Sequence, residues 1–193
     1  MNETKAVQWT VRAAYAAAVL FAIHLITYFI APIRDATTTS SPIVAELLAL
    51  LAVAEHLLVF PVVAALPAPR WVKAAGYGWL VIDIATDIMQ LNGTPKTTYL
   101  PMRYGGHISA ALWIASASWQ LKGGIRITGL LLALDLAVYS FIAFIPFTFV
   151  ILVPSLLLLP LWFTLSGRLL AEKSNVGRHS PNPVNNKQFL RGK

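Results

Sequence analysis

The chain has 193 residues, of which 57% are hydrophobic and only 12% are charged. Ordinary soluble domains carry about 25% charged residues, so this composition predicts an integral membrane protein. Cysteine is absent, which excludes disulfides and thiolate metal sites. The formal charge of +7 comes from basic residues at loop ends and in the tail. Basic residues placed in this way set the orientation of a membrane protein, and they do not indicate a nucleic-acid partner.

Six apolar runs follow one another along the chain, each near the roughly 20 residues that a helix needs to cross a bilayer. They lie at about 11–31, 43–66, 71–91, 104–121, 125–145 and 147–171. We therefore predict an all-α fold: a polytopic integral membrane protein whose single domain, residues 1–171, is a six-transmembrane-helix bundle. The break between the last two runs rests on Ile145-Pro146-Phe147 alone, and a proline kink within one longer helix would give the same pattern.

The basic residues set the orientation of these spans. Of the 15 Lys and Arg residues, Arg34, Lys96 and Arg103 fall on one side of the predicted bundle and the other 12 on the opposite side. Basic loops stay in the cytoplasm, so both termini are predicted to be cytoplasmic. The first run is longer than the apolar segment of a usual signal peptide, and we expect it to be a retained anchor helix.

Residues 172–193 are polar and basic, and we predict a cytoplasmic tail there. Such a tail can bind anionic lipid headgroups electrostatically. The alternative is a solvated segment that acts only as a topology signal.

Titratable residues lie inside the apolar runs. Five of the eight acidic residues and three of the four histidines are found there: Glu46, Glu55, Asp83, Asp87, Asp135, His24, His56 and His107. A carboxylate at membrane depth costs roughly 2.5 to 3.5 kcal/mol on insertion scales. No Lys or Arg lies near the middle of the runs, so we expect an anionic cluster without internal cations. A cluster of this kind predicts a functional site.

Asp83 and Asp87 are the most specific local pattern. Residues at i and i+4 of a helix lie about 5–6 Å apart, and two carboxylates at that distance repel each other. We expect one of them to stay protonated or a cation to lie between them. The structural alternative is a protonated Asp83 bonded to a neighbouring helix, with Asp87 reaching Arg103 or water.

Glu55 and His56 form the second pattern. Adjacent helical residues point about 100° apart, so both can border one cavity without facing the same spot. Glu46 lies nearly opposite Glu55 around the helix, and we expect it at the membrane interface.

We assign the acid–base groups of the predicted site to Asp83, Asp87, Glu55 and His56. The residues expected to bind a substrate are His24, His107, Asp135, Arg103, Gln90, Trp79, Trp113 and Tyr139. Packing histidines and interfacial aromatic anchors are the structural alternatives for several of these. We assign no metal ligand, and the cofactor is unknown.

The predicted function is a membrane-embedded enzyme that uses this cluster for acid–base chemistry on a lipophilic substrate, such as a lipid, an isoprenoid or a sterol-like molecule. An isomerase, a cyclase or a hydrolase would fit. The alternatives are a proton- or cation-coupled small transporter or channel, an intramembrane metal or haem site, and a non-catalytic assembly protein. A homo-oligomer could supply a transport path that one chain lacks.

Overall fold

The computed structural model describes residues 3–34, 40–142 and 149–179, and within these ranges the chain is helical without a strand. The helices are α1 (Glu3–Tyr28), α2 (Ala31–Arg34), α3 (Pro42–Ala65), α4 (Arg70–Leu91), α5 (Lys96–Trp119), α6 (Gly124–Ile142) and α7 (Phe149–His179). The predicted break at Ile145-Pro146-Phe147 and most of the predicted tail lie outside the described residues.

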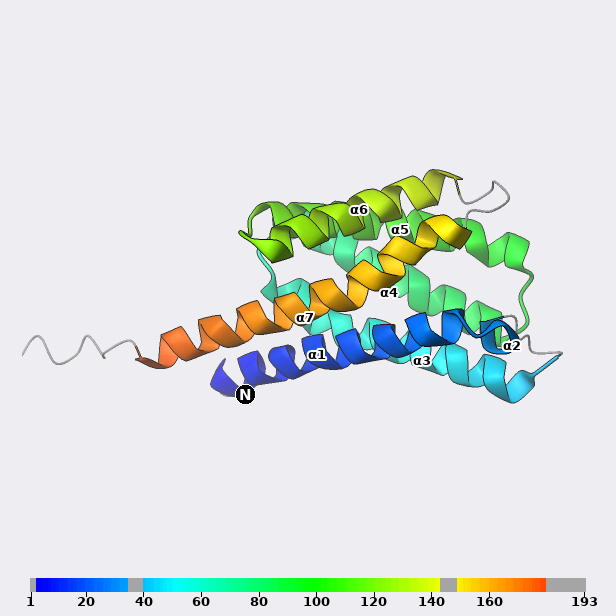
Figure 1. Ribbon diagram of the computed structural model, residues 1–193, viewed down its shortest axis with the longest axis horizontal. Coiled ribbons are helices and arrows are strands. Elements are labelled where there is room, and N and C mark those ends of the chain that lie inside the picture. The colour runs from blue at the N-terminus through cyan, green and yellow to red at the C-terminus, as the bar shows by residue number, and fades with distance from the viewer. Residues whose placement is uncertain (1–2, 35–39, 143–148, 180–193) are drawn as a thin grey trace, which may run out of the picture.

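The long helices pack as a closed ring (Figure 1). Each packs against the next in chain order, from α1 through α3, α4, α5 and α6 to α7, and α7 packs against α1. The start of α1 and the end of α7 lie at the same end of the bundle, which we call the terminal end. The opposite end carries α2 and the connection between α4 and α5.

Several helices are longer than the runs predicted from hydropathy. Helix α5 begins at Lys96 rather than near residue 104, and Pro101 lies inside it. One proline removes a single backbone donor, and the helix continues through it. Helix α7 continues to His179, so the first part of the predicted tail is helical. An ion pair at i and i+4 between Arg168 and Glu172, 3.0 Å apart, supports this extension.

The outer surface of the ring is apolar. Four helical segments are long and apolar enough to cross a membrane: Lys5–Tyr28, Pro42–Ala65, Gly124–Ile142 and Leu152–Asn175. Helices α4 and α5, of 22 and 24 residues, are also long enough, but polar residues lower their hydropathy. They too expose large apolar side chains, such as Val81 and Ile88 on α4 and Leu112 on α5. An apolar exterior around polar interior residues indicates a multi-pass membrane protein.

An aromatic layer fills the bundle on the terminal side of the polar residues. Trp79 stacks on Trp113 with ring centroids 6.0 Å apart, and Trp113 meets Trp162 edge to face at 5.4 Å. Trp162 donates a hydrogen bond from Nε1 to Ser118 Oγ at 3.1 Å. The three tryptophans are at most 2% exposed, so the layer closes the centre of the ring. Gly129 of α6 packs directly against Trp162 and Ser118.

Candidate functional site

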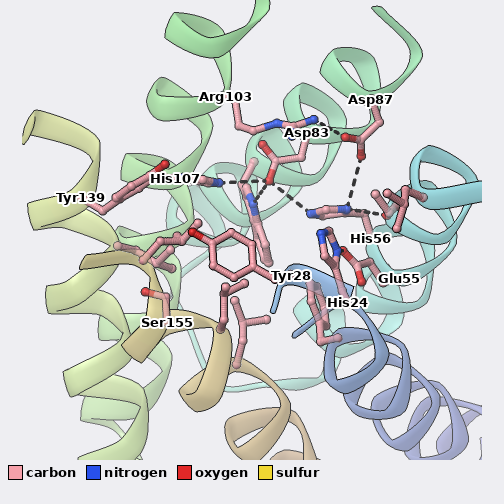
Figure 2. A pocket seen from close by; sticks show the side chains of 18 of the residues that line it. His24, Tyr28, Glu55, His56, Asp83, Asp87, Arg103, His107, Tyr139 and Ser155 are labelled. Atoms are coloured by element: carbon pink, nitrogen blue, oxygen red, sulfur yellow. Dashed lines mark hydrogen bonds and ion pairs between the residues drawn. The ribbon is translucent and has the colours of Figure 1, made fainter. Parts of the chain in front are cut away.

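A cavity of about 310 Å³ is lined by residues from the ends of the long helices farthest from the termini, with Trp79 of the aromatic layer at its border. Residues from each of the long helices line it, and its two sides differ (Figure 2). The polar side comes from α1, α3, α4 and α5 and consists of His24, Glu55, His56, Asp83, Asp87, Gln90, Arg103 and His107. The apolar side comes mainly from α6, α7 and α1, with Leu136, Leu152, Leu156, Leu159 and Phe21.

Ten of the twelve residues predicted for the site line this cavity, and Trp113 and Asp135 do not. Trp113 lies behind Trp79 in the aromatic layer. Asp135 reaches the cavity only through Ser155 of α7, whose backbone N–H donates to Asp135 Oδ2 at 2.8 Å and whose hydroxyl donates to the same oxygen. Glu46 is exposed on α3.

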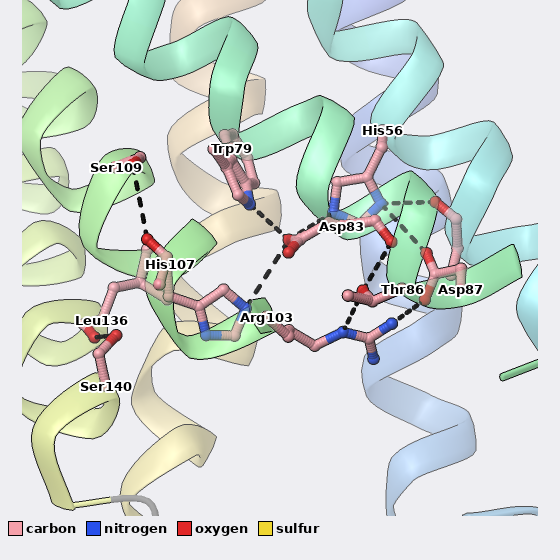
Figure 3. A network of polar contacts seen from close by, with 12 residues as sticks. His56, Trp79, Asp83, Thr86, Asp87, Arg103, His107, Ser109, Leu136 and Ser140 are labelled. Carbon is pink, nitrogen blue, oxygen red and sulfur yellow. Dashed lines mark hydrogen bonds and ion pairs between the residues drawn. The ribbon is translucent and has the colours of Figure 1, made fainter. Parts of the chain in front are cut away.

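Asp83 lies at the centre of the polar network (Figure 3). Its Oδ2 atom accepts a hydrogen bond from Trp79 Nε1 at 2.5 Å and lies 3.2 Å from His56 Nε2. His107 Nε2 is 3.7 Å from the same oxygen. Three nitrogens from α3, α4 and α5 therefore surround one carboxylate oxygen of a residue that is only 3% exposed.

The hydrogen bonds of His56 determine where its protons lie. His56 Nδ1 is 2.6 Å from the carbonyl oxygen of Ala52. Because a carbonyl oxygen only accepts, Nδ1 must carry a hydrogen. His56 Nε2 then shares a proton with Asp83, either as an imidazolium beside a carboxylate or as an imidazole beside a carboxylic acid. The arrangement is a proton-sharing pair of the kind used in acid–base catalysis.

Asp87 has a permanent cationic partner. Arg103 of α5 donates from Nη2 to Asp87 Oδ1, and its Nε donates to Thr86 Oγ1 at 3.0 Å. Thr86 in turn donates from Oγ1 to the backbone carbonyl of Asp83 at 2.8 Å. The expectation of a cluster without an internal cation is wrong here. The proposed pairing of Asp87 with Arg103 is present, because the early start of α5 places Arg103 two turns inside the helix.

Glu55 and His56 point in different directions, as their helical spacing predicts. Glu55 Oε1 lies 2.9 Å from His24 Nδ1 and joins α3 to α1. His56 faces Asp83 of α4. Glu55 is 1% exposed, whereas the His24 side chain is 35% exposed, so the contact lies at the edge of the interior.

Aromatic rings border the polar side near His107. The ring of Tyr139 lies 6.0 Å from that of His107, and Tyr104 meets Tyr139 edge to face at 5.6 Å. Gln90 lines the cavity at the end of α4. These rings border the cavity on the side of α6.

Sequence reasoning missed several lining residues. Leu152, Ser155, Leu156 and Leu159 recur every three to four positions on one face of α7. Nearly all of their neighbours in the chain are also apolar, so hydrophobic periodicity does not distinguish the inward face. Ser155, a polar residue directly after Pro154 in a run of leucines, was the one available signal.

No protein-family model, curated protein or solved structure matches the chain. The function is therefore argued from the geometry of the cavity. Among the residues that the structure describes, no three His, Asp or Glu side chains are grouped so that they could hold a metal ion.

Proposed function

We propose that the protein is a membrane-embedded enzyme that catalyses proton transfer on a lipophilic substrate bound in this cavity. The observation that carries the proposal is the convergence of Trp79, His56 and His107 on Asp83 Oδ2 inside the cavity. A buried carboxyl group with a fixed donor and two imidazoles in reach has the parts of a general acid and a general base.

The two-sided lining favours an amphipathic or apolar substrate. Leu136 and the leucines of α7 offer an apolar surface opposite Asp83. A substrate body lying against them would place its reacting end at the polar side. A volume of about 310 Å³ is at the lower end of the range of small-molecule sites, roughly 300–1,000 Å³.

In the proposed reaction the Asp83–His56 pair supplies a proton to a carbon of the substrate, and His107 removes a proton from a neighbouring carbon. One proton enters and one leaves, so the substrate is isomerised without a change of oxidation state. Positive charge that develops on the substrate is stabilised by the carboxylates of Asp87 and Glu55. The Nδ1 hydrogen bond of His56 to Ala52 keeps the ring oriented during transfer.

We also propose that α4 and α5 cross the membrane, which gives six spans with both termini in the cytoplasm. The common location of the two ends of the bundle and the concentration of basic residues there support this topology. The cavity would then lie in the outer half of the membrane. Binding of anionic headgroups by the basic tail and assembly as a homo-oligomer are further proposals.

Solvent deuterium exchange tests the proposed reaction. The full-length protein in nanodiscs is incubated in D₂O with a total membrane lipid extract, and carbon-bound deuterium is measured by high-resolution mass spectrometry after washing in H₂O. We expect one lipid class to gain deuterium with the wild type and with Glu46→Gln, which removes an exposed carboxylate on α3. We expect no gain with Asp83→Asn. Exchange that is absent from the wild type, or unchanged in Asp83→Asn, would refute the proposal.

A proton-coupled transporter is the second candidate. The side chains of Asp87, His56, Asp83 and His107 form a continuous chain of contacts that suits a proton relay. The aromatic layer on the terminal side of the cavity argues against a proton path through a single chain. Proton flux into proteoliposomes, abolished by Asp83→Asn, would favour this candidate over the enzyme.

A further inference from the structure

The hydrogen-bonding capacity of the cavity residues is incompletely used. Among the described residues, six buried side-chain polar atoms lack a hydrogen-bond partner, and four of them belong to residues that line the cavity. The four are Glu55 Oε2, Asp83 Oδ1, Asp87 Oδ2 and His107 Nδ1. Buried polar groups are nearly always hydrogen-bonded to protein or to water, so these four atoms must bond to whatever fills the cavity, either water or a ligand that replaces it.

Three of these atoms are carboxylate oxygens, which accept hydrogen bonds, and none of the three has a donor in the described residues. Asp87 Oδ2 lies 3.9 Å from His56 Nδ1, but that nitrogen already donates to Ala52. Glu55 uses Oε1 for His24 and leaves Oε2 unpaired. Asp83 Oδ1 is different, because α5 crowds it: a β-carbon added at Gly106 would lie only 3.0 Å from this oxygen. Glu55 and Asp87 are therefore the carboxylates left with an oxygen for a ligand.

We infer that the ligand of this cavity has a polar end that donates a hydrogen bond, a hydroxyl or an ammonium group, attached to an apolar body. The donor would lie between Glu55 and Asp87, and the body would lie along Leu136 and Leu156. This inference rests on the proposed function, since it names the ligand class of the same cavity.

A ligand end that only accepts hydrogen bonds would be disfavoured beside Glu55 and Asp87, although Arg103 carries N–H donors in the same cavity. An ether, ester or ketone oxygen would face carboxylate oxygens, and both acceptors would stay unsatisfied in the interior. Sites built to bond a hydroxyl or amine discriminate strongly against analogues without it for this reason.

Three matched probes test the inference: farnesol, its methyl ether and farnesylamine, which share one apolar body. Binding to the full-length protein in nanodiscs is measured by native mass spectrometry at several probe concentrations. A hydrogen bond to a charged group is worth roughly 1.5–3 kcal/mol, so the alcohol or the amine should bind about tenfold or more tightly than the ether. Tighter binding of the alcohol assigns a hydroxyl lipid, and tighter binding of the amine assigns a cationic one.

A variant locates the donor. Glu55→Gln replaces one oxygen with an NH₂ group and should reduce the preference for the donor probes, whereas Glu46→Gln should retain it. The wild-type comparison decides the matter by itself if Glu55→Gln fails to fold. Equal affinity for the ether and the alcohol, or binding of none of the three probes, would overturn the inference. If the alcohol or amine binds more tightly than the ether but no lipid gains deuterium, the proposed reaction is refuted and the assignment of the ligand class still holds.

Discussion

The close approach of α5 to Asp83 leads to a sharp prediction about Gly106. A β-carbon at this position would lie 3.0 Å from Asp83 Oδ1 and 3.1 Å from Ile82 Cγ2. Both contacts are tighter than van der Waals distance, so α4 or the Asp83 side chain must move by a few tenths of an ångström. Asp83 cannot turn away freely, because Trp79 Nε1 holds its other oxygen at 2.5 Å.

Gly106→Ala should therefore displace the carboxylate relative to His56 and His107. Misplacement of reacting groups by about 1 Å can cost 100-fold in rate, so a shift of a few tenths should cost about tenfold. Overpacking costs about 1–3 kcal/mol of stability. Alanine regains about 0.5–1 kcal/mol in a helix, so the net loss of stability should stay below about 2.5 kcal/mol.

The neighbouring residue supplies the control. Gly105 lies on the same helix, and no atom lies within 4 Å of an added β-carbon there. Gly105→Ala should keep the wild-type rate of deuterium incorporation and unfold at the same or a slightly higher temperature. The assay is the initial rate of carbon deuteration alongside thermal unfolding in the same nanodiscs. Equal rates for Gly106→Ala and Gly105→Ala would show that the position of Asp83 does not control the reaction.

Three further outcomes are expected. Arg103→Gln leaves Asp87 charged and unpaired in the interior and should lower stability by about 3 kcal/mol, measured by thermal unfolding. The added substitution Asp87→Asn should recover most of this loss. No recovery would mean that Arg103 stabilises the protein through other contacts. Ser155→Ala removes one hydrogen bond to α6 and should lower stability by about 1 kcal/mol. The rate of deuterium exchange should stay within a few-fold of the wild type. Loss of exchange would instead show that the Ser155 hydroxyl takes part in the reaction. Gly129→Ala places a methyl group inside the aromatic layer and should lower stability by at least about 1–3 kcal/mol. Gly124→Ala, where the added β-carbon has open space, should leave stability unchanged. Equal unfolding temperatures for the two variants would contradict the close packing at Gly129.

The polar cluster was predictable because hydropathy and helical spacing both apply to it. Asp83 and Asp87 stand out in an apolar run, and their spacing places them on one face of α4. The divergence of Glu55 and His56 follows from the 100° step of the helix. The pairing of Asp87 with Arg103 was foreseen as one alternative. The partners of Asp83, His56 and Glu55 were not predictable, because they depend on how the helices are ordered around the ring.

The errors have local causes. The predicted start of α5 near residue 104 left Arg103 just outside the helix, so its pairing with Asp87 was given only as an alternative. Asp135 was expected to face the cavity, because no titratable residue is near it in the sequence. Its partner is instead Ser155 on α7, a polar residue within a run of leucines. Contacts of this kind join residues 16 to 20 positions apart and require the three-dimensional packing.

The contact between α1 and α7 has a consequence for assembly. Because the first and last helices join to close the ring, the leucines of α7 cover the titratable groups only after the whole chain has been inserted. Without α7 the cavity lacks the side formed by Leu152, Leu156 and Leu159. A ligand that binds in the cavity would stabilise the state in which α7 is docked. The abundance of the protein in cells should therefore rise with the concentration of that ligand.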